Sequence, residues 1–127
     1  MTLLRSLLLA AVFAWSLPAS AADWKAFDAA AFAAAQKEGK PILIDVFAAW
    51  CPVCRAQGPV LTKLTSEPKF KDMIVFKVDF DTQKDALRAL KAQRQSTLIV
   101  FKGEQETGRS VGETSPGSIE ALLDSAL

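Results

Sequence analysis

Two cysteines three residues apart, Cys51 and Cys54, stand between an apolar run and a helical pattern. The run before them, residues 41–47, is typical of a buried strand, and residues 55–66 carry the apolar stripe of a helix. The first sulfur is therefore expected at the start of a helix, where unpaired N–H groups and the helix dipole stabilise a thiolate. Because the thiolate is the form that attacks disulfides, the sequence predicts a redox-active pair.

The rest of the composition removes most other interpretations of this pair. The chain has two cysteines and no histidine among its 127 residues. One chain therefore lacks the two further ligands of a tetrahedral zinc site, and Arg55 stands where haem attachment needs histidine. A purely structural disulfide stays open, although closing so short a loop removes little chain entropy. The preferred interpretation is a redox pair that uses no metal and no other cofactor.

The N-terminal segment has the layout of a secretory signal peptide. A single positive charge is followed by an apolar stretch, residues 7–17, and by an A-x-A site that ends at Ala21. We expect residues 1–21 to be removed and residues 22–127 to form one domain, with an uncleaved N-terminal anchor as the alternative. Export leads to an oxidising compartment, in which the pair can persist as a disulfide, and we expect that compartment to be a bacterial periplasm.

The charge of the expected mature chain is balanced. Arg5 is the one charged residue of the segment, so its removal takes the 15 basic residues to 14, against 14 acidic ones. A neutral chain without a basic run is not typical of proteins that bind nucleic acid or anionic membranes. We expect a monomer that acts on other proteins.

Helical and strand patterns alternate along residues 22–127. Helices are expected at 27–38, 55–66, 83–93 and 116–125, and strands at 42–47, 73–79, 97–101 and 106–111. The first strands alternate with helices and should be parallel, whereas the short turn at 102–104 makes the last two antiparallel. The sequence therefore predicts an α/β fold with a central mixed sheet of four to five strands and helices on both faces.

This layout, with Trp50 directly before the first cysteine, resembles the thioredoxin family from about residue 23 to residue 127. Four single positions also match the family: a buried aspartate (Asp45), a proline that kinks the motif helix (Pro59), a lysine near the aspartate (Lys77) and a glycine beside the substrate groove (Gly112). The resemblance implies the thioredoxin fold and thiol–disulfide oxidoreductase activity.

The run from Gly39 to Cys51 is most similar to periplasmic members of the family. These include the C-terminal domain of the interchange protein DsbD and the thioredoxins that work with the membrane protein CcdA. This finer resemblance implies a membrane electron donor of the CcdA/DsbD type. It also implies that the substrates are disulfides in exported proteins, apocytochrome c among them.

Each cysteine has an expected role. Cys51, at the helix start and nearer to solvent, should attack the substrate disulfide, and Cys54, one turn deeper, should resolve the mixed disulfide. Without histidine, Asp45 is the best acceptor for the Cys54 proton, because burial raises the pKa of a carboxyl group. Lys77 would pair with Asp45 and tune this shift. The alternatives are an Asp45 that is merely hydrogen-bonded to backbone and a Lys77 that is solvated at a sheet edge.

The residues expected to contact substrate surround the two sulfurs; they are Trp50, Pro52, Val53, Gln95, Ser96, Thr97 and Gly112. Trp50 is expected as a lid over the motif or as core. Ser96 departs from the family, which has a cis-proline there. A cis peptide before serine would cost about 3–4 kcal/mol, against about 0.5–1 before proline, so we expect a trans bond. The serine N–H and hydroxyl would be free to hydrogen-bond a thiolate, and serine would admit a metal ion that proline would shield.

Two other functions stay open. A disulfide oxidant or isomerase would use the same chemistry, but the absence of histidine and the presence of Asp45 favour a reductant. The alternative from another class is a periplasmic copper carrier or chaperone that binds the metal through both thiolates, which Ser96 motivates.

Overall fold

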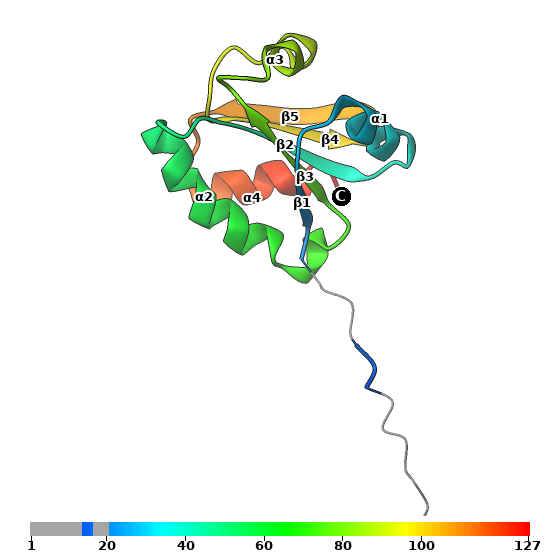
Figure 1. Ribbon diagram of the computed structural model, residues 1–127. Coiled ribbons are helices and arrows are strands. Elements are labelled where there is room, and N and C mark those ends of the chain that lie inside the picture. The colour runs from blue at the N-terminus through cyan, green and yellow to red at the C-terminus, as the bar shows by residue number, and fades with distance from the viewer. Residues whose placement is uncertain (1–13, 17–20) are drawn as a thin grey trace, which may run out of the picture.

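The computed structural model describes residues 14–16 and 21–127. The described part forms one mixed sheet with helices on both faces (Figure 1). The predicted signal peptide lies almost wholly outside the described residues, so its removal stays a prediction. Within the described ranges, no helix is both long and apolar enough to cross a membrane.

Ten elements follow one another along the chain. They are β1 (Asp23–Ala26), α1 (Ala29–Lys37), β2 (Pro41–Phe47), α2 (Pro52–Thr65), the 3₁₀ turn η1 (Pro68–Phe70), β3 (Ile74–Asp79), α3 (Lys84–Leu90), β4 (Thr97–Lys102), β5 (Gln105–Val111) and α4 (Pro116–Asp124). In the sheet the strands lie in the order β1-β3-β2-β4-β5. The pairs β1–β3 and β2–β3 are parallel, and β2–β4 and β4–β5 are antiparallel. The predicted mixed α/β sheet is confirmed.

Strand β1 was not expected from the sequence. It is four residues long, pairs with β3 alone and leaves most of its side chains exposed. Such a short edge strand needs neither an apolar run nor a clean alternation of apolar and polar residues. Its sequence, Asp-Trp-Lys-Ala, therefore carries no strand signal of its own.

Helix α3 is shorter than predicted. The apolar spacing favoured a helix from residue 83 to 93 capped by Thr82, but the structure places the N-cap at Gln83 and ends the helix at Leu90. Lys91 adopts φ 54°, in the left-handed region, which stops the helix there. Helix α2, by contrast, continues through Pro59 as expected.

The two faces of the sheet form two separate apolar layers. Ile42, Ile44 and Val46 of β2 pack with α1 and α3, whereas Leu43 packs with α2 and α4. Because side chains alternate along a strand, Asp45 faces the same side as Leu43. The buried carboxyl group therefore points toward the layer that contains the cysteine-bearing helix.

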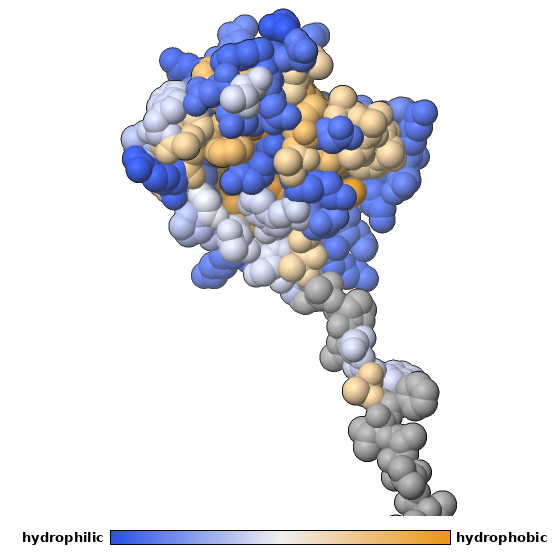
Figure 2. Space-filling model, viewed as in Figure 1, coloured by the Kyte–Doolittle hydropathy of each residue, from blue (hydrophilic) through white to orange (hydrophobic). Residues whose placement is uncertain are grey.

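The surface in Figure 2 is mainly polar, with apolar residues between the charged ones. A pale apolar area covers α1, whose sequence is mostly alanine. Small exposed alanines of this kind are ordinary on a helix surface and do not by themselves mark a binding site.

Candidate functional site

The two cysteines form a disulfide at the start of α2. Cys51 is the N-cap of the helix, and its Sγ accepts a hydrogen bond of 3.1 Å from the backbone N–H of Cys54. Pro52 occupies the first turn, where a missing N–H costs nothing. This confirms that the first sulfur lies where the helix N–H groups stabilise a thiolate.

The expected difference in solvent exposure is wrong for this disulfide form. Cys51 is 1% exposed, whereas Cys54 is half-buried. The Cys51 sulfur turns back over the first helical turn, where it is bonded to Cys54 and accepts the N–H of that residue.

Asp45 and Cys54 line one cavity of about 270 Å³. The cavity is lined by Trp24, Asp45, Phe47, Ala48, Ala49, Cys54, Arg55, Gly58, Thr62 and Lys77. Burial raises the pKa of the Asp45 carboxyl group to about 6, and the positive charge of Lys77 opposes this rise. A carboxyl group with this pKa can hold or release a proton near neutral pH, next to the second cysteine.

The alternative for Asp45 was a carboxylate satisfied by backbone hydrogen bonds. Asp45 is 6% exposed, and no hydrogen bond contributes to its pKa shift, which follows from burial and from Lys77. The structure therefore favours a carboxyl group that is desolvated and available, as the proton-transfer hypothesis requires.

Lys77 does not lie at a sheet edge. It stands opposite Asp45 in the parallel pair β2–β3, and β1 flanks β3 on the other side. Its Nζ lies 4.1 Å from the centroid of the Phe47 ring, so a cation–π contact holds the ammonium group at the rim of the cavity. The alternative of an edge lysine is wrong, because β1, which the sequence did not reveal, covers that edge.

Trp50 is not part of the core. Its side chain is 54% exposed, and its indole N–H donates to both carboxylate oxygens of Asp81, at 3.0 and 3.2 Å. Pro52 and Val53 are exposed as well. No sequence pattern indicated Asp81, because this contact joins the motif to the loop after β3, which is distant in sequence.

The peptide bond before Ser96 is trans, as expected, and Ser96 has a positive φ of 57°. Both donors that we expected to be free are used within the loop. The Ser96 N–H donates to the Val46 carbonyl at 2.8 Å, and its hydroxyl donates to the Gln95 carbonyl at 2.6 Å. Because backbone carbonyls already accept both hydrogens, neither is free to bind a thiolate in this conformation, and the entry of a metal ion beside Ser96 stays a prediction.

The other predicted contact residues lie around Ser96. The Gly112 N–H donates to the Ser96 carbonyl at 3.0 Å, and Gly112 is exposed with φ 74°. Thr97 is buried at the start of β4, where its hydroxyl donates to the Arg94 carbonyl, and Gln95 is half-buried. Gly112 can thus reach a substrate with its backbone, whereas the Thr97 side chain serves the loop itself.

One buried polar residue of this region, Gln57, was not predicted from the sequence. Gln57 of α2 is 1% exposed and donates through Nε2 to the carbonyls of Ser96, at 3.2 Å, and Glu113, at 2.8 Å. The sequence carries a weak signal for it, since Gln57 shares the apolar stripe of Leu61 and Leu64 at helical spacing.

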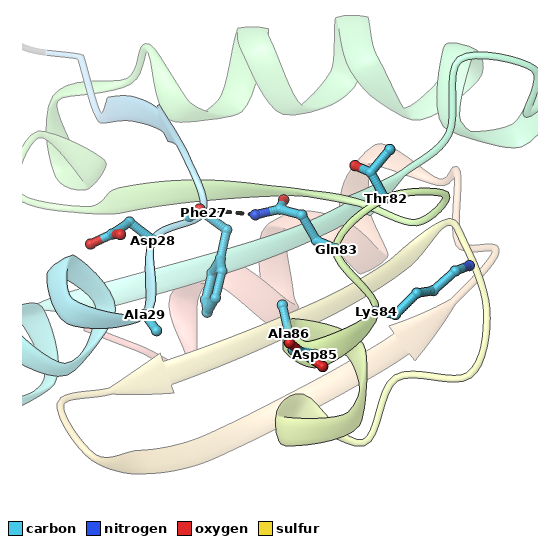
Figure 3. A pocket seen from close by; sticks show the side chains of 8 residues that line it. All are labelled: Phe27, Asp28, Ala29, Thr82, Gln83, Lys84, Asp85 and Ala86. Atoms are coloured by element: carbon cyan, nitrogen blue, oxygen red, sulfur yellow. Dashed lines mark hydrogen bonds between the residues drawn. The ribbon is translucent and has the colours of Figure 1, made fainter.

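A second cavity, of about 390 Å³, is lined by residues 27–29 and 82–86 (Figure 3). Gln83 and Asp28 in its lining make hydrogen bonds to backbone groups. Gln83 donates to the Phe27 carbonyl at 3.0 Å and accepts the Asp79 N–H at 2.9 Å, and Asp28 caps α1. None of the predicted site residues lines this cavity, so the candidate site is the disulfide with its own cavity.

Comparison with known proteins points the same way. The family profile named Thioredoxin matches residues 23–125. A thioredoxin H-type of Brassica campestris is 36% identical over 90 residues, which cover 71% of each chain. A bifunctional thioredoxin reductase/thioredoxin of Mycobacterium leprae is 36% identical over 85 residues, 67% of this chain but only 18% of that longer protein. The crystal structure of Trxlp from Edwardsiella tarda EIB202 superposes with a TM-score of 0.78 at 48% identity, covering 80% of this chain and 98% of that one.

Proposed function

The chain belongs to the thioredoxin family and is a thiol–disulfide oxidoreductase, and from this premise we propose that it works as a reductant of disulfides in exported proteins. The observation that carries the direction is the buried Asp45 next to Cys54. Above pH 6 its negative charge disfavours a thiolate nearby and thereby favours the disulfide over the dithiol. A pair whose disulfide is favoured gives up its electrons readily.

The apolar motif residues support the same direction. Pro52 and Val53, between the two cysteines, add no positive charge that would stabilise a thiolate. The helix start stabilises the Cys51 thiolate, because Cys51 Sγ accepts the N–H of Cys54 there.

The reaction follows from these positions. The Cys51 thiolate attacks one sulfur of the substrate disulfide, and the other substrate sulfur leaves as a thiolate. Cys54 then gives its proton to Asp45 and attacks the Cys51 sulfur, which releases the second substrate thiolate and forms the disulfide of this structure. Two electrons have passed to the substrate, and Asp45 can give its proton to one of the released substrate thiolates. A membrane protein with its own dithiol, of the CcdA/DsbD type, would return two electrons to the pair.

The proposed location is the bacterial periplasm, with cleavage near Ala21. The apolar N-terminal stretch and the A-x-A site support it. Expression of the full chain in a bacterial host, followed by fractionation and intact mass measurement, tests this point. A periplasmic protein that begins at residue 22 is the expected result, and a full-length membrane-bound chain would contradict it.

A redox titration of the Cys51–Cys54 pair tests the direction of the reaction. The protein is equilibrated with mixtures of reduced and oxidised glutathione, and the thiol fraction is read by alkylation and mass spectrometry. A potential near the value of thioredoxin, about −270 mV, is expected, and one near about −120 mV would assign an oxidant instead. Reduction of insulin disulfides, measured alongside, is expected at a catalytic rate.

A further inference from the structure

Gln57 connects the cysteine-bearing helix to two loops beside the disulfide. Both of its amide hydrogens are used, one on the Ser96 carbonyl before β4 and one on the Glu113 carbonyl after β5. The Gly112 N–H, next to Glu113, also donates to the Ser96 carbonyl. One side chain of α2 thus joins the two loops, which are already joined to each other.

Packing alone does not explain a glutamine at this position. Its Oε1 is buried and has no hydrogen-bond partner. The amide cannot simply be reversed, because Oε1 would then face two carbonyl oxygens. A methionine of similar size would fill the space without leaving an unpaired buried oxygen. The two donated hydrogen bonds are therefore what this polar side chain provides.

The loop that Gln57 holds has a conformation that needs support. Ser96 has φ 57°, a region that residues other than glycine avoid. Its N–H donates to Val46, near the end of β2, so the loop is tied to the strand that leads to Cys51. Because β4 begins where the antiparallel β2 ends, this loop and the disulfide lie at the same end of these strands.

We propose that Gln57 is a positioning residue for protein substrates, which holds the Ser96 and Gly112–Glu113 loops at a fixed distance from the sulfurs. The inference rests on the proposed reduction of protein disulfides. Gly112 is exposed and bonded to the Ser96 loop at this end of the sheet. We expect a protein chain that brings its disulfide to Cys51 to contact these loops, and a small disulfide to reach the sulfurs without them. Loss of the two hydrogen bonds should therefore affect the two kinds of substrate differently.

The test compares Gln57→Met with wild-type protein on two substrates. Insulin is the protein disulfide and 5,5′-dithiobis(2-nitrobenzoate) is the small one. The ratio of kcat/KM for insulin to kcat/KM for the small disulfide is expected to fall about 10- to 100-fold, mainly through a higher KM. A misplacement of about 1 Å can cost about 100-fold, and smaller displacements cost less. The methionine keeps the volume, so the lost groups are the two donors.

Gln83→Met is the matched control. Gln83 also makes two hydrogen bonds to backbone groups but lines the other cavity. This variant is expected to lose stability like Gln57→Met and to keep the substrate ratio within about twofold of wild type, since no loop at the sulfurs depends on it. An equal fall of the ratio in both variants, or no fall in Gln57→Met, would overturn the inference.

Hydrogen exchange of the unmodified protein gives a test that needs no variant. The side-chain amide of Gln57 is expected to exchange at least tenfold more slowly than that of the exposed Gln93. Equal exchange at Gln57 and Gln93 would overturn the inference about Gln57 and leave the proposed function untouched. Wild-type protein that reduces neither substrate would overturn the proposed function and, with it, the role of Gln57.

Discussion

Asp45 and Cys54 line the same cavity, although they come from different elements, β2 and α2. The carboxyl group is desolvated, and its pKa is raised to about 6. A group that titrates near neutral pH therefore shares a cavity with the cysteine that loses a proton in the proposed second step.

Replacement of the carboxyl group should slow the second step of the reaction. Asp45→Asn is expected to lower the rate at which Cys54 resolves the mixed disulfide by about 100-fold at pH 7.5, as for the loss of a general base. Quenched-flow trapping with an alkylating agent measures this rate. Asp85→Asn, which removes an exposed carboxylate on α3, is the control and should leave the rate unchanged. Equal rates in all three proteins would exclude Asp45 as the proton acceptor.

Asp45 should also make stability depend on pH. Its pKa is about 6 in the folded protein and 3.8 in the unfolded chain. Between these two pH values the unfolded chain has released a proton that the folded protein keeps. The free energy of unfolding of the oxidised protein should therefore fall as pH rises from 4 to 6, by up to about 3 kcal/mol, and then level off. Urea titrations at pH 4, 5, 6 and 7 measure this. In Asp45→Asn this part of the slope should be absent, and an unchanged slope would contradict the assignment.

The order of attack can be read from trapped intermediates. Cys54→Ser is expected to accumulate a mixed disulfide between Cys51 and a substrate protein, because the resolving thiol is missing. Cys51→Ser should accumulate little mixed disulfide, since its remaining sulfur, that of Cys54, lies inside the first helical turn and not at the N-cap. Non-reducing electrophoresis and mass spectrometry of the adducts provide the measurement. The burial of Cys51 makes this test informative, and the reverse pattern would assign the attack to Cys54.

Two substitutions at Ser96 should differ in their cost to the free energy of unfolding. Ser96→Pro is expected to lower the free energy of unfolding by about 3 kcal/mol or more, because proline fixes φ near −65° and removes the N–H that donates to Val46. Ser96→Gly should change it by less than about 1 kcal/mol, since glycine accepts a positive φ. Chemical denaturation compares the two. A proline variant as stable as wild type would mean that the loop adopts another shape without cost.

The sequence predicted the sheet and the redox pair because both depend on local patterns. Apolar runs mark β2, β3 and β4, and the spacing of Cys51 and Cys54 after β2 places the pair at a helix start. The apolar run around Asp45 and the resemblance to thioredoxins, which keep a buried aspartate at this position, also predicted its burial, which the structure confirms.

The parts that the sequence did not predict depend on contacts between distant segments. The strand β1 is held by pairing with β3, and its own residues are mostly polar or exposed. The hydrogen bonds of Gln57 and Trp50 join segments 31 to 56 residues apart. The donors of Ser96 were expected to be free because its φ angle, which decides where they point, is not visible in a sequence.

The alternation of side chains along β2 links the fold to the chemistry. A slip of one residue between β2 and its neighbours would turn Asp45 into the layer of α1 and α3 and bring Ile44 or Val46 to the sulfurs. Insertions or deletions in this strand would therefore disable proton transfer and disrupt both apolar layers together. The hydrogen-bond ladder that stabilises the sheet thus also determines which face carries Asp45, the proposed proton acceptor.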